Sequence, residues 1–95
     1  SHFTNLGFLD KNVFSVVKID RSVVSKLASD NVTVKVVDVI VKECHNSGMM
    51  VLAEGVENVD ELNHIKMLNI DLVQGYYYDR PIIPEEFVSK YIKEN

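Results

Sequence analysis

The sequence predicts an α/β fold in which about three parallel β-strands alternate with helices. Three short apolar runs rich in β-branched residues supply the strands, and stretches with apolar residues three and four apart lie between them. Parallel neighbouring strands need such crossovers, which are right-handed. The chain has 95 residues and forms one domain at most. Three such units make up about half of an eight-stranded barrel or part of an open doubly wound sheet.

The expected strands are short and show little alternation of apolar and polar residues. Such runs suit strands that are buried on both faces of a parallel sheet. They span residues 14–20, 49–54 and 70–74, and each ends in polar residues. A three-stranded parallel sheet would leave two open edges, which are prone to pair with another chain.

The longest helical pattern follows the first strand and a short helix expected over residues 22–27. Asp30 or Asn31 can cap its start, and Gly48 stands where a left-handed residue usually ends a helix. Apolar residues at helical spacing mark its buried face: Val36, Val37, Ile40, Val41 and Cys44.

Two further helices are expected after the second and third strands. Asn58 stands three residues before Glu61, a variant of the capping box, and Pro84 opens a helical first turn that carries two acids. Their apolar faces comprise Val59, Leu62, Ile65 and Leu68 in one, and Phe87, Val88, Tyr91 and Ile92 in the other. The opening stretch is expected to form an additional, uncapped helix with Phe3, Leu6, Phe8 and Leu9.

Composition and charge exclude several classes of protein. The chain is 46% hydrophobic and 25% charged, and its net charge of −4 argues against binding to DNA or RNA. Cys44 is the only cysteine, which excludes an internal disulfide and a zinc cluster and favours the reducing cytoplasm. The sequence has no run of about 18 apolar residues and no signal-peptide pattern. We therefore expect no membrane contact by this segment, although a longer parent could be anchored through other segments.

Polar side chains gather where the three predicted strands end. Lys18 and Asp20 are two residues apart and therefore point to the same face of an extended segment. Glu54 and Gln74 close the next two strands, and Glu57 follows shortly after the first of them. Ligands of parallel α/β folds bind at these carboxyl ends. A lysine, carboxylates and an amide suit magnesium or manganese, which lowers the pKa of a bound water and makes it a nucleophile.

Each of these residues also has a structural interpretation. Asp20 could pair with Arg21 or cap the short helix over residues 22–27, and Glu57 could serve the N-terminus of the following helix. Three consecutive tyrosines could stack on a base, although packing against neighbours is the commoner role. We expect the histidines, which lack metal-ligand spacing, at the surface and Cys44 in the core. The tyrosines are Tyr76, Tyr77 and Tyr78, and the histidines are His2, His45 and His64.

Four segments, taken in order, resemble successive motifs of the EAL domain family. They are residues 17–22 (VKIDRS), 52–58 (LAEGVEN), 71–76 (DLVQGY) and 79–81 (DRP). Their spacing also agrees, and the resemblance covers nearly all of the chain. It implies a partial TIM-like (β/α) barrel, roughly the C-terminal half of an EAL barrel. It further implies hydrolysis of cyclic di-GMP to linear pGpG with two magnesium or manganese ions.

The resemblance implies a role for each polar residue at the strand ends. Lys18 resembles the family lysine that contacts the catalytic water, and Gln74 resembles the glutamine near that water and the substrate. Glu54 resembles the glutamate assigned to metal binding or water activation. Glu57 resembles the second glutamate of that motif, which steadies a neighbouring catalytic loop, and Asp20 matches an aspartate with a supporting role.

Other parts of the family pattern are absent from these 95 residues. They are the Glu-Ala-Leu segment, the asparagine and glutamate of the strands that follow it, and the aspartate pair of the metal-bridging loop. We therefore expect residues 1–95 to be the C-terminal fragment of a single EAL domain, without turnover of its own. The alternative is a degenerate EAL domain that acts as a cyclic di-GMP receptor or a protein-interaction module. A half barrel with open edges is also expected to form a homodimer or to pair edge to edge.

Overall fold

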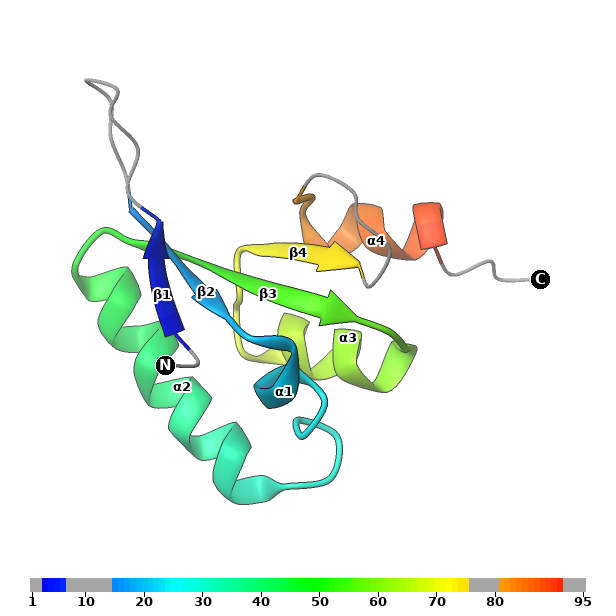
Figure 1. Ribbon diagram of the computed structural model, residues 1–95, viewed down its shortest axis with the longest axis horizontal. Helices are drawn as coiled ribbons and strands as arrows, with labels where there is room; N and C mark the ends of the chain where they lie inside the picture. Colours follow the sequence, from blue (N-terminus) through cyan, green and yellow to red (C-terminus); the bar gives the residue numbers. More distant parts are fainter. Residues whose placement is uncertain (1–2, 7–14, 76–80, 92–95) are drawn as a thin grey trace.

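The structure, a computed structural model, describes residues 3–6, 15–75 and 81–91, with side chains described for 15–75 and 81–87. Within these residues four strands form one sheet in the order β1-β2-β3-β4 (Figure 1). The strands are β1 (Phe3–Leu6), β2 (Val16–Ile19), β3 (Met50–Val56) and β4 (Leu72–Gly75). β2, β3 and β4 run parallel, which confirms the predicted α/β fold with three parallel strands.

Helices connect the parallel strands in the predicted order. They are α1 (Arg21–Val24) and α2 (Asn31–Asn46) between β2 and β3, α3 (Val59–Met67) between β3 and β4, and α4 (Pro84–Tyr91) after β4. The first three helices all contact β3, and α4 contacts β4 and α3. Figure 1 shows α2 and α3 on the same side of the parallel strands, with α4 beside β4.

The core lies between the parallel strands and the helices. The strands contribute Val17, Ile19, Val51, Ala53 and Val73, and the helices contribute Val24, Val37, Val41, Leu62, Ile65 and Phe87. Alternate side chains of a strand point to opposite faces of the sheet. The strand residues between these core positions therefore project from the other face, where the polar strand ends lie.

The predicted buried face of α2 is correct except at Val36. Val37, Val41 and Cys44 are buried, and Ile40 packs partly buried against them. Val36, by contrast, is 50% exposed. Successive residues of a helix are about 100° apart around its axis, so Val36 lies on the flank of α2 rather than on the line that faces the sheet.

The ends of α2 match the sequence signals. Asp30, and not Asn31, is the N-cap, because its carboxylate accepts hydrogen bonds from the Val32 N–H at 3.0 Å and the Thr33 hydroxyl at 2.9 Å. The hydrogen bond from the Thr33 side chain lowers the pKa of Asp30 below its usual value. Past the other end of the helix, Gly48 has a φ of +74°, the left-handed conformation predicted there.

The capping box of α3 reaches one residue further back than usual. The Asn58 side chain accepts a hydrogen bond from the Glu61 N–H at 2.9 Å, as predicted. The Glu61 carboxylate in turn accepts the Glu57 N–H at 2.9 Å. Glu61 as a whole residue is only 6% exposed, and this hydrogen bond gives its carboxylate a partner there.

The prediction of a helix at the start of the chain is wrong for the residues that the structure describes there. Phe3–Leu6 form β1, which pairs antiparallel with β2, so that Phe3 lies opposite Ile19 and Leu6 opposite Val16. A short helix without a cap is marginal in water, whereas the edge of β2 offers backbone hydrogen-bond partners. Phe8 and Leu9 lie outside the described residues.

The two edges of the three parallel strands, which were expected to be open, are partly covered. β1 occupies the edge of β2. On the far side, Val73 of β4 and Ile82 exchange backbone hydrogen bonds of 2.7 and 2.8 Å in an isolated antiparallel bridge. Within the described residues the sheet still ends at β1 and β4, so homodimerisation or edge pairing stays a prediction.

Candidate functional site

The carboxyl ends of β2, β3 and β4 bring together Lys18, Glu54 and Gln74, which we call the polar rim. In the parallel register, Lys18 lies opposite Leu52, and Leu52 lies opposite Leu72. Glu54 lies opposite Gln74, one layer of side chains further along. Side chains in register share a face of the sheet. All three rim residues therefore belong to the face that is turned away from the helical core.

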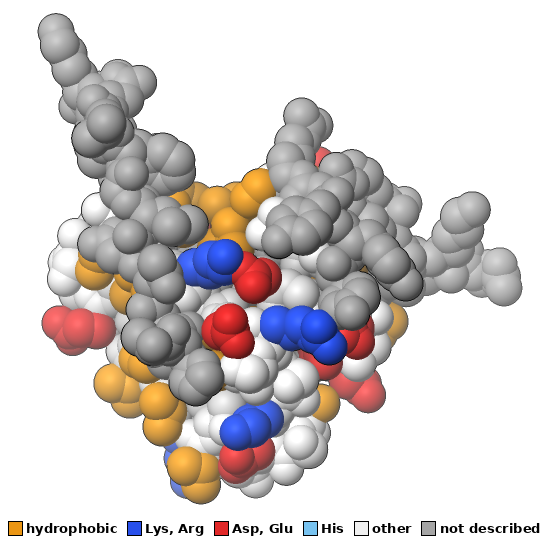
Figure 2. All heavy atoms as spheres, viewed as in Figure 1, with side chains coloured by type: hydrophobic (Ala, Val, Ile, Leu, Met, Phe, Trp, Pro, Cys, Tyr) orange, Lys and Arg blue, Asp and Glu red, His pale blue; other side chains and the backbone are white. Residues whose placement is uncertain are grey.

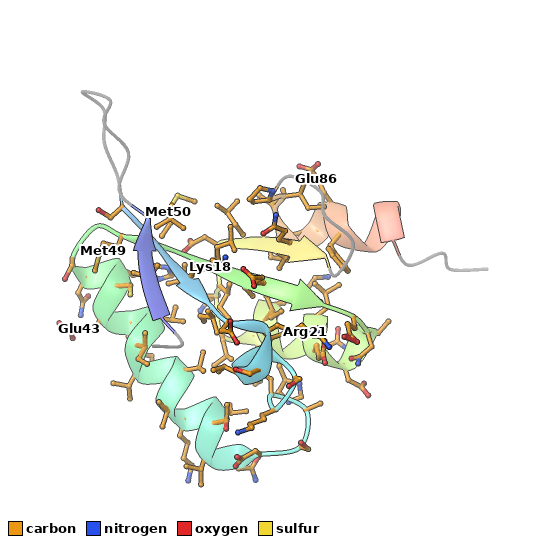
Figure 3. The ribbon with its side chains drawn as sticks, viewed as in Figure 1. Lys18, Arg21, Glu43, Met49, Met50 and Glu86 are labelled. Carbon is orange, nitrogen blue, oxygen red and sulfur yellow. The ribbon has the colours of Figure 1, made fainter. Side chains whose placement is uncertain are left out.

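Lys18 and Glu54 form an ion pair between β2 and β3, with the Nζ atom of Lys18 on Oε2 of Glu54. Figure 3 shows Lys18 on β2 beside β3, and Figure 2 shows basic and acidic side chains next to one another in the middle of the same view. The two side chains are 35% and 29% exposed. Water screens an ion pair at this exposure, so its contribution to stability is small. Both groups remain accessible to a ligand that approaches from solvent.

On the same face of the sheet, the residues that precede Lys18 and Glu54 along their strands are apolar. Val16 and Leu52 are 3% and 4% exposed, and they stand two residues before Lys18 and Glu54 in their strands. A charge moved into such surroundings would lose hydration at a large cost in free energy. The apolar layer thus holds the charged ends of Lys18 and Glu54 at the carboxyl end of the sheet.

Asp20 caps α1, one of the two structural interpretations of this residue. Its carboxylate accepts hydrogen bonds from the Ser22 N–H at 3.0 Å and the Ser22 hydroxyl at 2.6 Å. α1 is shorter than the helix expected over residues 22–27, although backbone turns continue to Leu27. Asp20 therefore fixes the passage from β2 into α1, two residues after Lys18.

Glu57 connects the end of β3 to both neighbouring helices. Its Oε1 lies 3.5 Å from Nε of Arg21, and the two side chains are 44% and 52% exposed. Its backbone N–H is bound by Glu61 at the start of α3. The side chain of Glu57 thus pairs with the first residue of α1, and only its backbone N–H takes part in the capping of α3.

Gly55 is a position of the site that the sequence analysis did not single out. It has a φ of +74°, and the register between β3 and β4 shifts at this point: Glu54 pairs with Gln74, and Val56 pairs with Gly75. Such a bulge bends the strand and redirects the neighbouring side chain. The available signal was a glycine directly after the glutamate that closes an apolar strand.

The family profile described as EAL domain matches residues 1–81. The chain belongs to the EAL domain family. The predicted partial TIM-like barrel is confirmed by an EAL domain protein from Listeria monocytogenes EGD-e. That structure aligns with a TM-score of 0.63 and 36% identity, over 80% of this chain and 31% of the Listeria chain.

The names of two further similar proteins carry information on activity and ligands. The chain is 30% identical over 76 residues to the cyclic di-GMP phosphodiesterase PdeL of Escherichia coli K12, which is 80% of this chain and 21% of PdeL. Klebsiella pneumoniae BlrP1 was solved in complexes of cyclic di-GMP with manganese or calcium. It aligns with a TM-score of 0.63 and 29% identity over 73% of this chain and 18% of BlrP1. The chain spans about a third or less of each of these relatives.

The polar rim of this EAL chain has the donor chemistry of one part of a divalent-cation site. Glu54 offers a carboxylate, and Gln74, its partner in register, offers an amide oxygen. Magnesium and manganese prefer oxygen ligands of these kinds. In the part of the chain that the structure describes, no three His, Cys, Asp or Glu side chains gather as a complete ligand set. The rim therefore fits a metal site only if further ligands come from outside these residues.

The histidines that the structure describes lie at or near the surface, as predicted. Nε2 of His45, which is exposed, lies 2.7 Å from Oδ2 of Asp71. Nδ1 of His64 lies 2.8 Å from the backbone oxygen of Asp60. His2 falls outside the described residues.

Cys44 is buried in the core, as predicted, and burial raises the pKa of its thiol. The predicted packing of Tyr76, Tyr77 and Tyr78 lies outside the described residues. Across the residues that the structure describes, none of the helices has the length and apolar character needed to span a bilayer.

Proposed function

We propose that this chain supplies the Lys18–Glu54–Gln74 part of a cyclic di-GMP phosphodiesterase site, as the C-terminal segment of an EAL domain that includes residues 1–95. The observation that carries the proposal is the ion pair between Lys18 and Glu54 at the carboxyl end of parallel strands, with Gln74 next in register. The likeness to PdeL, and to BlrP1 with its bound cyclic di-GMP, supports this substrate.

The reaction adds one water to one phosphodiester bond of cyclic di-GMP and opens the ring to linear pGpG. A P–O bond to the incoming oxygen forms, and a P–O bond to a ribose oxygen breaks. The accessible ammonium of Lys18 can hold the attacking water or stabilise the negative charge that develops on the phosphate. Gln74, on the strand beyond Glu54, can orient the water or a phosphate oxygen through its amide.

Glu54 is the proposed metal ligand of this chain, and it can also accept a proton from the water. Two magnesium or manganese ions, when bound in the complete domain, would activate the water and neutralise the phosphate. The remaining ligands would lie outside this chain. Asp20 and Glu57 take supporting roles in the proposal, because their contacts hold α1 and the end of β3 in place.

A titration followed by NMR tests this assignment on the chain itself. Cyclic di-GMP is added with Ca²⁺, a diamagnetic ion chosen because BlrP1 was solved with calcium and cyclic di-GMP. We expect saturable shift changes at Lys18, Glu54 and Gln74 that require Ca²⁺ and are lost in Glu54→Gln. Glu43→Gln, which changes an exposed acid of α2, serves as the matched control and should behave like the wild type.

The outcomes of this titration separate the proposal from the alternative. Shifts that require Ca²⁺ and Glu54 support a phosphodiesterase site. Shifts at the rim that persist without Ca²⁺ favour a degenerate EAL domain that acts as a receptor. Shifts centred away from the rim, or unaffected by Glu54→Gln, would contradict the assignment.

We also propose that the 95 residues alone do not turn over cyclic di-GMP, because the rim offers only part of a metal site. Chromatography of cyclic di-GMP incubated with the chain and Mg²⁺ or Mn²⁺ should yield no pGpG above the protein-free control. Formation of pGpG that depends on metal and on Glu54 would show that the chain holds a complete site.

A further inference from the structure

We propose that Arg21 is a positioning residue that fixes the carboxyl end of β3 and thereby holds the Glu54 carboxylate beside Lys18. The functional meaning of this inference rests on the proposed function of the polar rim. Its structural content can be tested without nucleotide or metal. Figure 3 shows Arg21 close to the carboxyl end of β3.

The aliphatic part of Arg21 lies directly on Gly55. A Cβ atom placed on Gly55 would come within 2.6 Å of Cγ and 2.8 Å of both Cβ and Cδ of Arg21. Those distances are shorter than any ordinary carbon contact, so the arginine stem occupies the space that a side chain at this position would need. Gly55 thus meets two requirements at once, a positive φ of +74° and the close approach of Arg21.

The guanidinium end of Arg21 continues along the same segment. Its Nε lies 3.5 Å from Oε1 of Glu57, two residues beyond Gly55. At the observed exposures of 52% and 44%, this pair contributes little to stability. The contact that matters for the bulge is therefore the one between the aliphatic stem of Arg21 and Gly55.

The other end of the contact is anchored independently. Arg21 is the first residue of α1, directly after the N-cap Asp20, whose carboxylate binds Ser22 through two hydrogen bonds. α1 therefore presents the arginine stem from a fixed position. Because Gly55 directly follows Glu54, a shift of the bulge would move the Glu54 backbone with it.

This arrangement sets the geometry of the ion pair from both strands. Lys18 lies three residues before Arg21 on the β2 side, and Glu54 lies one residue before Gly55 on the β3 side. Catalysis is sensitive to such positions, since a displacement of about 1 Å can lower a rate about a hundredfold. The role of Arg21 is thus to couple the end of β2 to the end of β3.

NMR of the isotopically labelled chain tests the coupling directly. The readout is the nuclear Overhauser effect between the Lys18 Hε and Glu54 Hγ protons, recorded where each variant is folded. We expect Arg21→Ala to weaken this signal at least about twofold, and Arg21→Lys, which keeps the stem, to retain most of it. Lys42→Ala is the matched control, because it removes a basic residue from an exposed ion pair with Asp38 on α2.

Gly55→Ala provides the second half of the test. The added Cβ should displace the bulge when Arg21 is present. It should cost less of the Lys18–Glu54 signal in the Arg21→Ala background, where the contacts with Cγ and Cδ are gone and only the contact with Cβ remains. If the fractional losses of the Lys18–Glu54 signal in the two single variants simply multiply in the double variant, the direct contact is contradicted. An unchanged Lys18–Glu54 signal in folded Arg21→Ala would overturn the proposal.

Arg21→Met keeps the test decisive if Arg21→Ala does not fold. Methionine retains an unbranched stem over Gly55 and loses only the charge, so the Lys18–Glu54 signal should stay close to that of the wild type. A loss as large as that expected for alanine would overturn the role of the stem. Failure of cyclic di-GMP to bind would count against the proposed function and would leave this result untouched.

Discussion

His45 and Asp71 lie 2.7 Å apart, Nε2 to Oδ2, at the amino ends of β3 and β4, opposite to the polar rim. The same carboxylate oxygen accepts the Val51 N–H at 2.7 Å. Asp71 thus joins the end of α2 to the starts of two parallel strands. Its position suits stability, whereas the residues proposed for chemistry lie at the carboxyl ends, as is usual in parallel α/β proteins.

Asp71→Ala should destabilise the chain by about 1–3 kcal/mol, because it leaves the partly buried Val51 N–H without its acceptor. Asp71→Asn keeps a side-chain oxygen and should cost less. Urea denaturation followed by circular dichroism measures both. Asp38→Ala, which breaks an exposed ion pair on α2, should stay within about 0.5 kcal/mol. Equal losses for Asp71→Ala and Asp38→Ala would contradict the role given to Asp71.

The neighbours Val36 and Val37 allow a matched test of the core. Val37 is fully buried and Val36 is 50% exposed. Val37→Ala should therefore cost about 1.5–3 kcal/mol. Val36→Ala should be neutral or slightly stabilising, since alanine has the higher helix propensity. Thermal or urea denaturation measures the loss of unfolding free energy in both variants. A larger loss for Val36→Ala than for Val37→Ala would contradict the buried face assigned to α2.

The Asp30 cap predicts a dependence of stability on pH. The hydrogen bond from Thr33 holds the pKa of Asp30 below its ordinary value of 3.8. The cap's ionic contribution is therefore complete above that ordinary value and is lost as the pH falls through the lowered pKa. Asp30→Asn keeps an oxygen for capping but does not titrate. The difference in unfolding free energy between wild type and Asp30→Asn should shrink between about pH 6 and about pH 3, and a constant difference would refute the assignment.

Cys44 should react slowly with thiol reagents while the chain is folded. Burial raises the pKa of its thiol, and the nearby Asp71 and Glu43 carboxylates act in the same direction, so little thiolate is present near neutral pH. The rate of modification by a chromogenic disulfide should increase at least about tenfold in denaturing urea. Equal rates in the folded and the unfolded chain would contradict the burial of Cys44.

The three parallel strands and the polar rim could be predicted because their signals are local. Apolar β-branched runs mark the strands, and a polar residue ends each of them. The relation of Glu54 to Gln74 follows from parallel pairing alone, since strand ends of one sheet meet at one edge. The caps at Asp30 and Asn58 are likewise carried by a few neighbouring residues.

The features that were missed depend on contacts distant in the sequence. Phe3 and Leu6 fit helical spacing, yet their segment pairs with β2, because an available sheet edge outweighs a weak local preference. The contact of Arg21 with Gly55 joins two strand ends that lie far apart in the sequence. Neither residue signals the other in the sequence.

Glu54 and its neighbours at the polar rim are proposed to form one part of a divalent-cation site. Paramagnetic broadening by Mn²⁺ in NMR spectra of the chain tests it most directly, because the effect falls steeply with distance from the ion. We predict that substoichiometric Mn²⁺ broadens the signals of Glu54, Gln74 and Lys18 first, and that Glu54→Gln removes this selectivity while Glu43→Gln preserves it. Broadening that begins at other acids, or that is the same in wild type and Glu54→Gln, would contradict a metal site at the polar rim.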